Sequence, residues 1–487
     1  MLDIRLSSLA LAALVVVSLA GCAAVGPDYQ KPATPLDASF INAGASGTNA
    51  QAPADDIAQF WRGFNDPVLN ALIERAVAAN TDVRLAQARL QEARALQGEA
   101  DASALPGVGI EGNAQRSVAP QTQQPGASRS ARTSNSFDAN FIAGWEIDLF
   151  GGVRRTREAA AAQVSASEAG VHAAQTAVAA EVARNYLALR GLQERQRVTE
   201  ANLANQRESL RITEARLEAG RARQLDVAGA RALVASTEAV LPALQTQIET
   251  TALRLATLTA QSPRQVLGNL ATPQPMPTLP VTDLATLPLG TPEQWLQRRP
   301  DVAVAERQLA AATAGIGIAR SELYPRLSLS GLLGFNAARL GDLFTSDAAR
   351  YAVGIGVSWT PFDFGTIRSR IAASEARTTQ RLVVFEQTVA LALEETEGAF
   401  SAFNRNTQRS ERLQEAARHA DEAAQLARAR FEGGVTDFQT VLQAEREVLA
   451  IRDQLVQAQV DTAASLVAVY RAIGGGWTPS VSTQAAR

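Results

Sequence analysis

Side chains that could perform catalysis or hold a metal ion are scarce in this sequence. The 487 residues include one cysteine, two histidines and two methionines. His172 and His419 both fall inside long helical patterns, where we expect them on solvated faces. A soft-metal site usually needs Met, Cys or His in combination, and no such spacing occurs. The sequence therefore predicts no enzyme, no metal site and no cofactor.

The single cysteine carries the clearest chemical motif. An apolar run over 9–20 is too short to span a bilayer and ends in small residues, as a signal peptide does. The sequence LAGC that ends at Cys22 matches the bacterial lipobox, in which the cysteine thiol receives a diacylglycerol and becomes the mature N-terminus. We predict lipidation of Cys22; the alternative is an ordinary signal peptide with an incidental cysteine. Ala23, rather than Asp, is typical of lipoproteins sent to the outer membrane.

The elements behind this anchor begin with amphipathic strands. From Phe137 to Leu149 every odd position is apolar and most even positions are polar or small. Strict alternation predicts a strand with one apolar and one polar face. The run exceeds the usual globular strand of about 5–6 residues and suits the roughly 9–11 residues of a tilted transmembrane strand. Gly151-Gly152 then ends the alternation, and a long helical pattern follows.

The same order of strand, glycine and helix occurs twice. Tyr351 to Trp359 alternates in the same way and is followed by PFDFGTIRSR and a second long helical run. Trp145 corresponds to Trp359, and Gly151 to Gly365, each 214 residues further on. Further upstream, TDVRLAQARLQ is echoed by PDVAVAERQLA at an offset of 219. These fixed offsets indicate an internal duplication.

The helical runs are longer than a compact domain needs. Residues 154–218 contain no proline, and ~64 residues at ~1.5 Å each make a helix of ~96 Å. Leu203, Leu210 and Leu217 recur at seven-residue intervals, which favours a coiled coil. A partner helix is expected from Gln224 to Leu258, interrupted at Pro242. The second copy predicts a long helix over 366–432 and a return helix from Thr436 to about Ile473.

These patterns divide the chain into consecutive parts, each with a predicted role. They are a signal peptide (1–21), a lipid anchor and extended tether (22–65), a first repeat (66–265; strands about 107–115 and 137–149, long helices about 153–258), an equatorial connector (266–298), a second repeat (299–473; strands about 326–336 and 351–360, long helices about 366–472) and a C-terminal tail (474–487).

Four membrane-length strands cannot close a barrel alone. Closure takes about eight strands, and an open edge in lipid leaves backbone groups without partners. Copies of the chain must therefore share one barrel, with eight strands in a dimer or twelve in a trimer. A net charge of −3 argues against a nucleic-acid partner, which usually leaves a basic footprint.

Several motifs together resemble the TolC family of outer-membrane efflux factors. They are the lipobox followed by GPDY, the tandem strand–loop–strand–helix units, and the paired tips RLEAGRARQLDV (216–227) and RFEGGVTDFQTV (430–441). The chain is most similar to the lipoprotein branch, OprM- or NodT-like, that serves resistance–nodulation–division pumps. The resemblance implies a mainly α fold: a trimeric twelve-stranded transmembrane β-barrel in the outer membrane, continued by a periplasmic α-helical barrel. It also implies a periplasmic adaptor and an inner-membrane pump as partners.

The turns at the tips are the candidate gate. Gly220 and Gly433-Gly434 end the two long helices. TolC-like relatives carry pore-facing aspartates at positions that match Thr440 and Gln443, and neither is acidic here. Asp226 occupies the Thr440 position in the first repeat, so Asp226 and Asp437 could form a carboxylate ring at the mouth.

Helix capping is the alternative role for these aspartates. Thr436-Asp437-Phe438-Gln439 fits a capping box, with Thr436 as the expected N-cap and Asp437 favourable at the positive end of the helix dipole.

Two classes of function fit these elements. The first is a passive outer-membrane exit duct for drugs or other small molecules, delivered by an inner-membrane pump through an adaptor. The second is a structural or adhesive coiled-coil lipoprotein that conducts nothing. The duplicated amphipathic strands favour the duct, because a stalk needs no hairpins of bilayer length.

Overall fold

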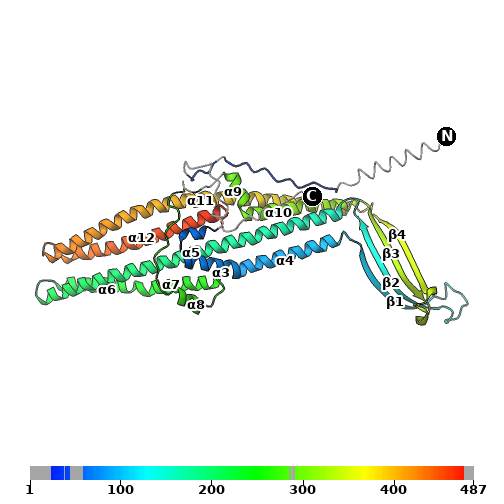
Figure 1. Cartoon of the computed structure of the whole chain (residues 1–487), viewed down its shortest axis with the longest axis horizontal. Helices are drawn as coiled ribbons and strands as arrows, with labels where there is room; N and C mark the ends of the chain where they lie inside the picture. The colour runs from blue at the N-terminus through cyan, green and yellow to red at the C-terminus, as the bar shows by residue number, and fades with distance from the viewer. Residues whose placement is uncertain (1–23, 38, 44–58, 285–286, 288–290, 476–487) are drawn as a thin grey trace. The chain divides into compact units, whose positions relative to one another are not determined.

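A computed structural model describes residues 24–37, 39–43, 59–284, 287 and 291–475 (Figure 1). The predicted signal peptide, Cys22 and most of the C-terminal tail lie outside these residues. The chain divides into two compact units. The strand unit comprises Met1–Pro32, Leu90–Ser167 and Ala305–Phe385, and the helix unit comprises Ala33–Arg89, Glu168–Val304 and Glu386–Arg487. Each unit contains parts of both sequence repeats.

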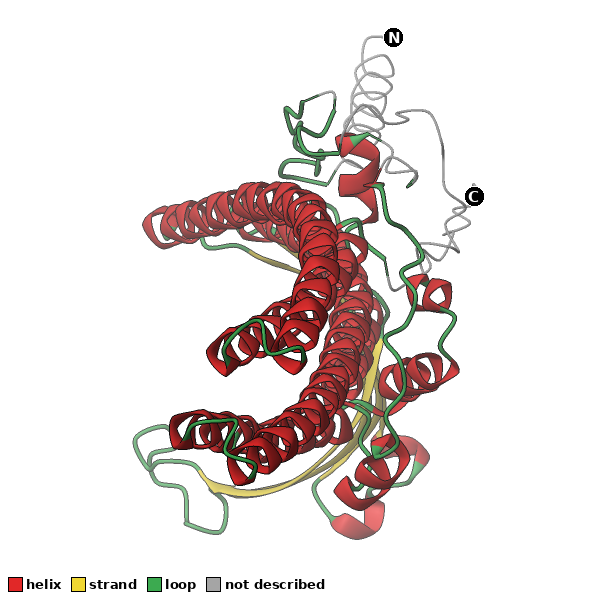
Figure 2. Ribbon diagram, turned by 90° about the vertical axis from the view of Figure 1, so that its left-hand side faces the viewer, coloured by secondary structure: helices red, strands yellow, loops and turns green. Residues whose placement is uncertain are grey.

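Four long antiparallel strands form the sheet of the strand unit, labelled in Figure 1 and partly visible in yellow behind the helices in Figure 2. They are β1 (Gly107–Val118), β2 (Thr133–Ile147), β3 (Arg326–Ala337) and β4 (Ala349–Ser358), in the spatial order β1-β2-β3-β4. The four predicted strands are therefore present. The first hairpin extends further into the predicted loop at both ends, and the 3₁₀ turns η3 (Leu340–Asp342) and η4 (Ser346–Ala348) lie between β3 and β4.

The register of the sheet separates an apolar face from a polar one. Trp145 lies opposite Leu329, and Leu329 lies opposite Ile355, so these side chains share one face. Large apolar side chains on this face are exposed in the single chain, among them Val108, Ile110, Phe141, Leu333, Tyr351, Val353, Ile355 and Val357. An apolar face that the chain does not cover is what a lipid-facing barrel wall requires.

The polar face carries a hydrogen-bonded cluster. The Arg350 guanidinium lies 2.8 Å from Asp138 Oδ1, and Asn336 Nδ2 donates to the same oxygen at 2.7 Å. Arg350 also donates to Asn140 Oδ1 at 3.1 Å. Gly334 lies under this crossing, where a Cβ would stand 2.7 Å from Asn140 Cα. Glycine is therefore required there for β3 to pass beneath the polar cluster.

The duplication is visible in matching hydrogen bonds at the ends of the strands. Trp145 Nε1 donates to the Ala104 carbonyl at 3.0 Å, and Trp359 Nε1 donates to the Leu323 carbonyl at 3.1 Å. Each indole thus ties its strand to the end of the helix that precedes the neighbouring strand. An interfacial tryptophan with a satisfied N–H suits the border of a membrane.

The helices include two of exceptional length. Helix α5 (Gly152–Glu218) has 67 residues and α11 (Phe364–Glu432) has 69. The turn after α5 leads into α6 (Gln224–Glu238) and then α7 (Val240–Leu258), and the turn after α11 leads into α12 (Phe438–Ala472). The remaining elements are η1 (Phe60–Phe64), α3 (Pro67–Ala79), α4 (Thr81–Ala102), α8 (Pro263–Leu270), α9 (Pro292–Arg298) and α10 (Pro300–Ser321).

The predicted partner helix over 224–258 is two helices. The break falls at Ala239, between α6 and α7, rather than at Pro242 itself. A proline ring clashes with the carbonyl four residues earlier, here that of Glu238, the last residue of α6. By length and composition this run could also cross a membrane. Ala230 and Leu233 of α6 instead pack on α12, as a coiled-coil partner should.

Candidate functional site

The turns that join each long helix to its partner use one left-handed glycine each. Gly220 has φ +68° and Gly434 has φ +73°. Just beyond them, Arg221 N donates to Arg216 O at 2.7 Å, and Val435 N donates to Arg430 O at 2.9 Å. Both turns therefore follow the Schellman pattern, in which a left-handed glycine lets the chain satisfy the last carbonyls. Gly433 still belongs to the helical pattern, since its N–H donates to Ala429 O.

Arg216 joins the two tips. Its guanidinium donates to the carbonyls of Phe431 and Glu432 at 2.9 and 2.8 Å, and its Cζ lies 4.4 Å from the centre of the Phe431 ring. The positive charge thus sits at the C-terminal end of α11, where the helix dipole is negative. The tip sequence RLEAGRARQLDV begins at this arginine, but it does not reveal the contact, because both partners of Arg216 lie more than 200 residues away.

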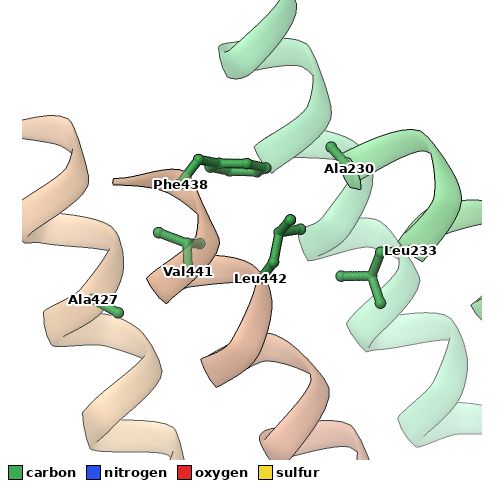
Figure 3. Packing of buried hydrophobic residues seen from close by; sticks show 6 residues of the cluster. All are labelled: Ala230, Leu233, Ala427, Phe438, Val441 and Leu442. Carbon is green, nitrogen blue, oxygen red and sulfur yellow. The ribbon is translucent and has the colours of Figure 1, made fainter. Parts of the chain in front are cut away.

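A small hydrophobic cluster lies behind this junction (Figure 3). It brings together α6, α11 and α12 through Ala230, Leu233, Ala427, Phe438, Val441 and Leu442, with Phe431 packed against them. Phe438 is 2% exposed, and its ring centre lies 5.0 Å from that of Phe431. The Phe431 ring therefore has Arg216 on one side and packs against the apolar cluster elsewhere.

Asp226 is buried and engaged near the start of α6. Its Oδ2 accepts the Arg223 N–H at 3.0 Å, and its Oδ1 lies 3.3 Å from Arg223 Nη2. The side chain of Asp226 is 8% exposed. A third-position carboxylate that reaches back to the N-cap amide is half of a capping box. Asp226 thus performs the capping role within its own chain, and its place at a channel mouth stays a prediction.

Asp437, not Thr436, is the N-cap of α12. Asp437 Oδ1 accepts from Thr440 N at 3.2 Å and from Thr440 Oγ1 at 2.9 Å. The predicted capping box that begins at Thr436 is therefore wrong; the Thr436 hydroxyl is buried without a hydrogen-bond partner in the described chain. The burial of Phe438 sets the start of the helix one residue later than expected. Thr440 and Gln443 are exposed on its first turns.

The chain just after Cys22 is held against the strand unit. Arg155 donates to Val25 O and Gly26 O, each at 3.2 Å, and pairs with Asp28 at 2.7 Å. Gly26 has φ +97°, and a Cβ there would lie 2.5 Å from Gly317 Cα. The segment and α10 thus cross with their backbones in contact, which only glycines allow.

Tyr29, the residue after Asp28, anchors the same segment. Its hydroxyl donates to Glu306 Oε1 at 3.0 Å. Burial and the adjacent Glu306 carboxylate raise the pKa of Tyr29 well above its usual value. The phenol therefore keeps its proton, and this hydrogen bond, across the physiological pH range.

Further along, the tether is docked on the helix unit. The Glu397 carboxylate accepts the backbone N–H groups of Ile41 and Asn42 at 2.7 and 3.0 Å. Phe40 inserts edge-on between Trp295 and Phe400, with centroid separations of 5.8 and 5.2 Å. Residues 24–37 and 39–43 of the predicted tether, which we call the strap, thus make docking contacts near both ends, where the sequence predicted only an extended tether.

The histidines occupy helix surfaces. His419 lies 3.7 Å from Glu422 with most of its side chain exposed, and His172 is 3.3 Å from the Gln175 side chain. Within the described residues, no group of three or more His, Cys, Asp or Glu side chains is placed to hold a metal ion.

Comparison with known proteins gives consistent matches along the chain. The model of the outer membrane efflux protein family matches residues 72–261 and 291–475. The pyoverdine export outer membrane protein OpmQ of Pseudomonas putida is 32% identical over 444 residues, covering 90% of this chain and 92% of OpmQ.

Solved channels have the same fold. The outer-membrane channel OprN has a TM-score of 0.86 and 39% identity, over 93% of this chain and all of that one. The open state of the MtrE outer membrane channel of Neisseria gonorrhoeae has a TM-score of 0.81 and 27% identity, over 94% of this chain and 99% of that one.

Proposed function

The chain belongs to the outer membrane efflux protein family, and from this premise we propose how its assembly works. It is the outer-membrane channel component of an efflux system in a Gram-negative bacterium, with a TolC-like fold of β-barrel and periplasmic helical barrel. It works with a periplasmic adaptor and an inner-membrane pump. We propose that the chain is a passive duct for small molecules and performs no chemistry on its cargo.

The open sheet supports a homotrimer. Strands β1 and β4 each pair on one side only within the described chain, so each leaves a row of backbone N–H and C=O groups without partners. In lipid each such group costs several kcal/mol. Pairing β4 of one copy with β1 of the next removes every edge, and three copies give a closed barrel of twelve strands.

Lipid attachment at Cys22 is the second part of the proposal. Cys22 precedes by three residues the Val25–Gly26 segment that Arg155 binds. Its acyl chains would therefore be held beside the strand unit, close to where β2 ends and α5 begins. The shared barrel anchors the protein in any case, so the lipid adds affinity and places the N-terminus.

One experiment tests both assembly and conduction. Purified protein in mild detergent should have the mass of three chains, and it should form discrete conductance steps in planar bilayers. A stable, folded monomer would contradict the shared barrel. Trimers that insert but never conduct, under any applied voltage or salt, would instead favour a structural coiled-coil lipoprotein.

A further inference from the structure

A hollow of about 840 Å³ lies between α10 and α11 in the strand unit. Its floor is made of small residues of α10, including Ala311, Ala312 and Gly315. Three arginines of α11 line one wall at helical spacing: Arg370, Arg377 and Arg381. The site is thus a roomy groove with a basic wall and nothing bulky to fill it.

Most of the positive charge in this groove is not neutralised. Arg370 pairs with Glu322 at 2.8 Å, which uses the one acidic side chain among the lining residues. Arg381 donates to the neutral Gln308 side chain at 3.0 Å. Arg377 has no hydrogen-bonding or charged partner anywhere in the described chain. Two guanidinium groups therefore retain free donors and unbalanced charge.

The N-terminal segment shows which side of α10 is the outer one. In the proposed assembly that segment leads to a lipidated Cys22, whose acyl chains must reach the bilayer around the barrel, so the segment runs over the outer surface. It touches α10 at Glu306 and Gly317. The groove is lined by Gln308 and Gly315, each two residues away. Two residues turn a helix by about 200°, which places the groove on the opposite, inner side of α10.

The salt bridges between the two helices agree with this orientation. Arg320, three residues after Gly317, pairs with Glu375 at 2.8 Å on the side of the N-terminal segment. Arg370 and Glu322 form the corresponding bridge on the groove side. A salt bridge therefore joins α10 to α11 on each side of the pair, and the arginines without a charged partner among the described residues, Arg377 and Arg381, lie on the inner side.

We propose that this groove binds anionic groups of the cargo, namely carboxylate, phosphate or sulfonate, as they pass through the bore. The inference rests on the proposed duct function and extends it to a substrate class. A planar guanidinium donates two parallel hydrogen bonds to such a group. The small residues of the floor leave room for the rest of the molecule, and the open groove lets it leave again. Three copies would form a basic band around the bore.

Direct binding tests the site without conduction. The probe is pyranine, a fluorescent trisulfonate, and its anisotropy is measured with the detergent-purified protein. The variant combines Arg377→Gln with Arg381→Gln, and the matched control is Arg368→Gln. Arg368 lies on the same helix, about 180° around from Arg377, exposed and outside the groove. We expect about tenfold weaker binding in the double variant and none of this loss in the control. Wild-type binding should fade in ~1 M salt, where charges are screened beyond ~3 Å. Equal binding by all three proteins would overturn the proposal.

Ion selectivity tests whether the groove faces the bore. The reversal potential is measured across a planar bilayer under a potassium chloride gradient, with pyranine then added on either side. The double variant should shift selectivity toward potassium and lose the block by pyranine, while Arg368→Gln behaves as wild type. Binding in solution with unchanged selectivity and no block would place the groove outside the bore and refute the inference. Absence of any wild-type current would refute the duct itself, which the binding assay does not depend on.

Discussion

Replacing Arg216 by alanine should loosen the junction between the two tips. Arg216 contributes two hydrogen bonds to the ends of α11 and a stacking contact with Phe431. A hydrogen bond from a charged donor is worth roughly 1.5–3 kcal/mol, and a cation–π contact at an exposed site about 0.5–1 kcal/mol. The low ends of these ranges sum to about 3.5 kcal/mol, and because the side chain is only half-buried we discount this sum for solvent screening to about 3 kcal/mol.

That loss is large enough to change the resting state of the channel. At about 1.4 kcal/mol per factor of ten, about 3 kcal/mol shifts the equilibrium between closed and loosened tips roughly a hundredfold. If the resting duct is nearly shut at the tips, Arg216→Ala should raise the time-averaged resting conductance in planar bilayers. Amide hydrogens near Gly220 and Gly434 should exchange faster in the same variant, because the turns open more often.

Two further variants separate the junction from charge alone. Arg211→Ala removes an exposed arginine five residues away that pairs with Glu208 in its own helix at 2.6 Å, and it should leave conductance and exchange unchanged. Arg216→Lys keeps the charge but cannot span both carbonyls, so its effect should be intermediate. Wild-type conductance together with wild-type exchange rates in Arg216→Ala would show that the tips are held by the hydrophobic cluster instead.

Three other changes probe the anchor, the mouth and the strap. Cys22→Ser should leave the precursor unprocessed or mislocalised while the barrel retains partial function; a mature N-terminus at another residue in mass spectra would refute the assignment. Asp226→Ala with Asp437→Ala should raise resting conductance or weaken cation selectivity if the carboxylates line the mouth. A loss of only about 1 kcal/mol per cap in helix stability, with conduction unchanged, would leave them as caps. Gly317→Val should expel the Val25–Gly26 segment and expose it to protease, whereas Gly98→Val, with open space around it, should not.

Local periodicity determined much of this protein before any packing was known. Alternation over 137–149 and 351–359 predicted strands, and the offset of 214 residues predicted the repeat that the paired indole bonds display. Proline-free runs predicted the long helices within two residues of their observed ends. These features follow from spacing within one segment, because the period of a strand or helix determines which face each side chain occupies.

Tertiary structure decided the contacts between segments far apart in the chain. The strap crossing at Gly26 and Gly317 needs two backbones to meet, and the Arg216 junction needs a carbonyl 215 residues away. The N-cap of α12 shows the limit most clearly, because Thr436 and Asp437 both suit that position by residue type. Burial of Phe438 against Phe431 selects Asp437, and such a choice depends on the partner that packing brings, which local spacing does not encode.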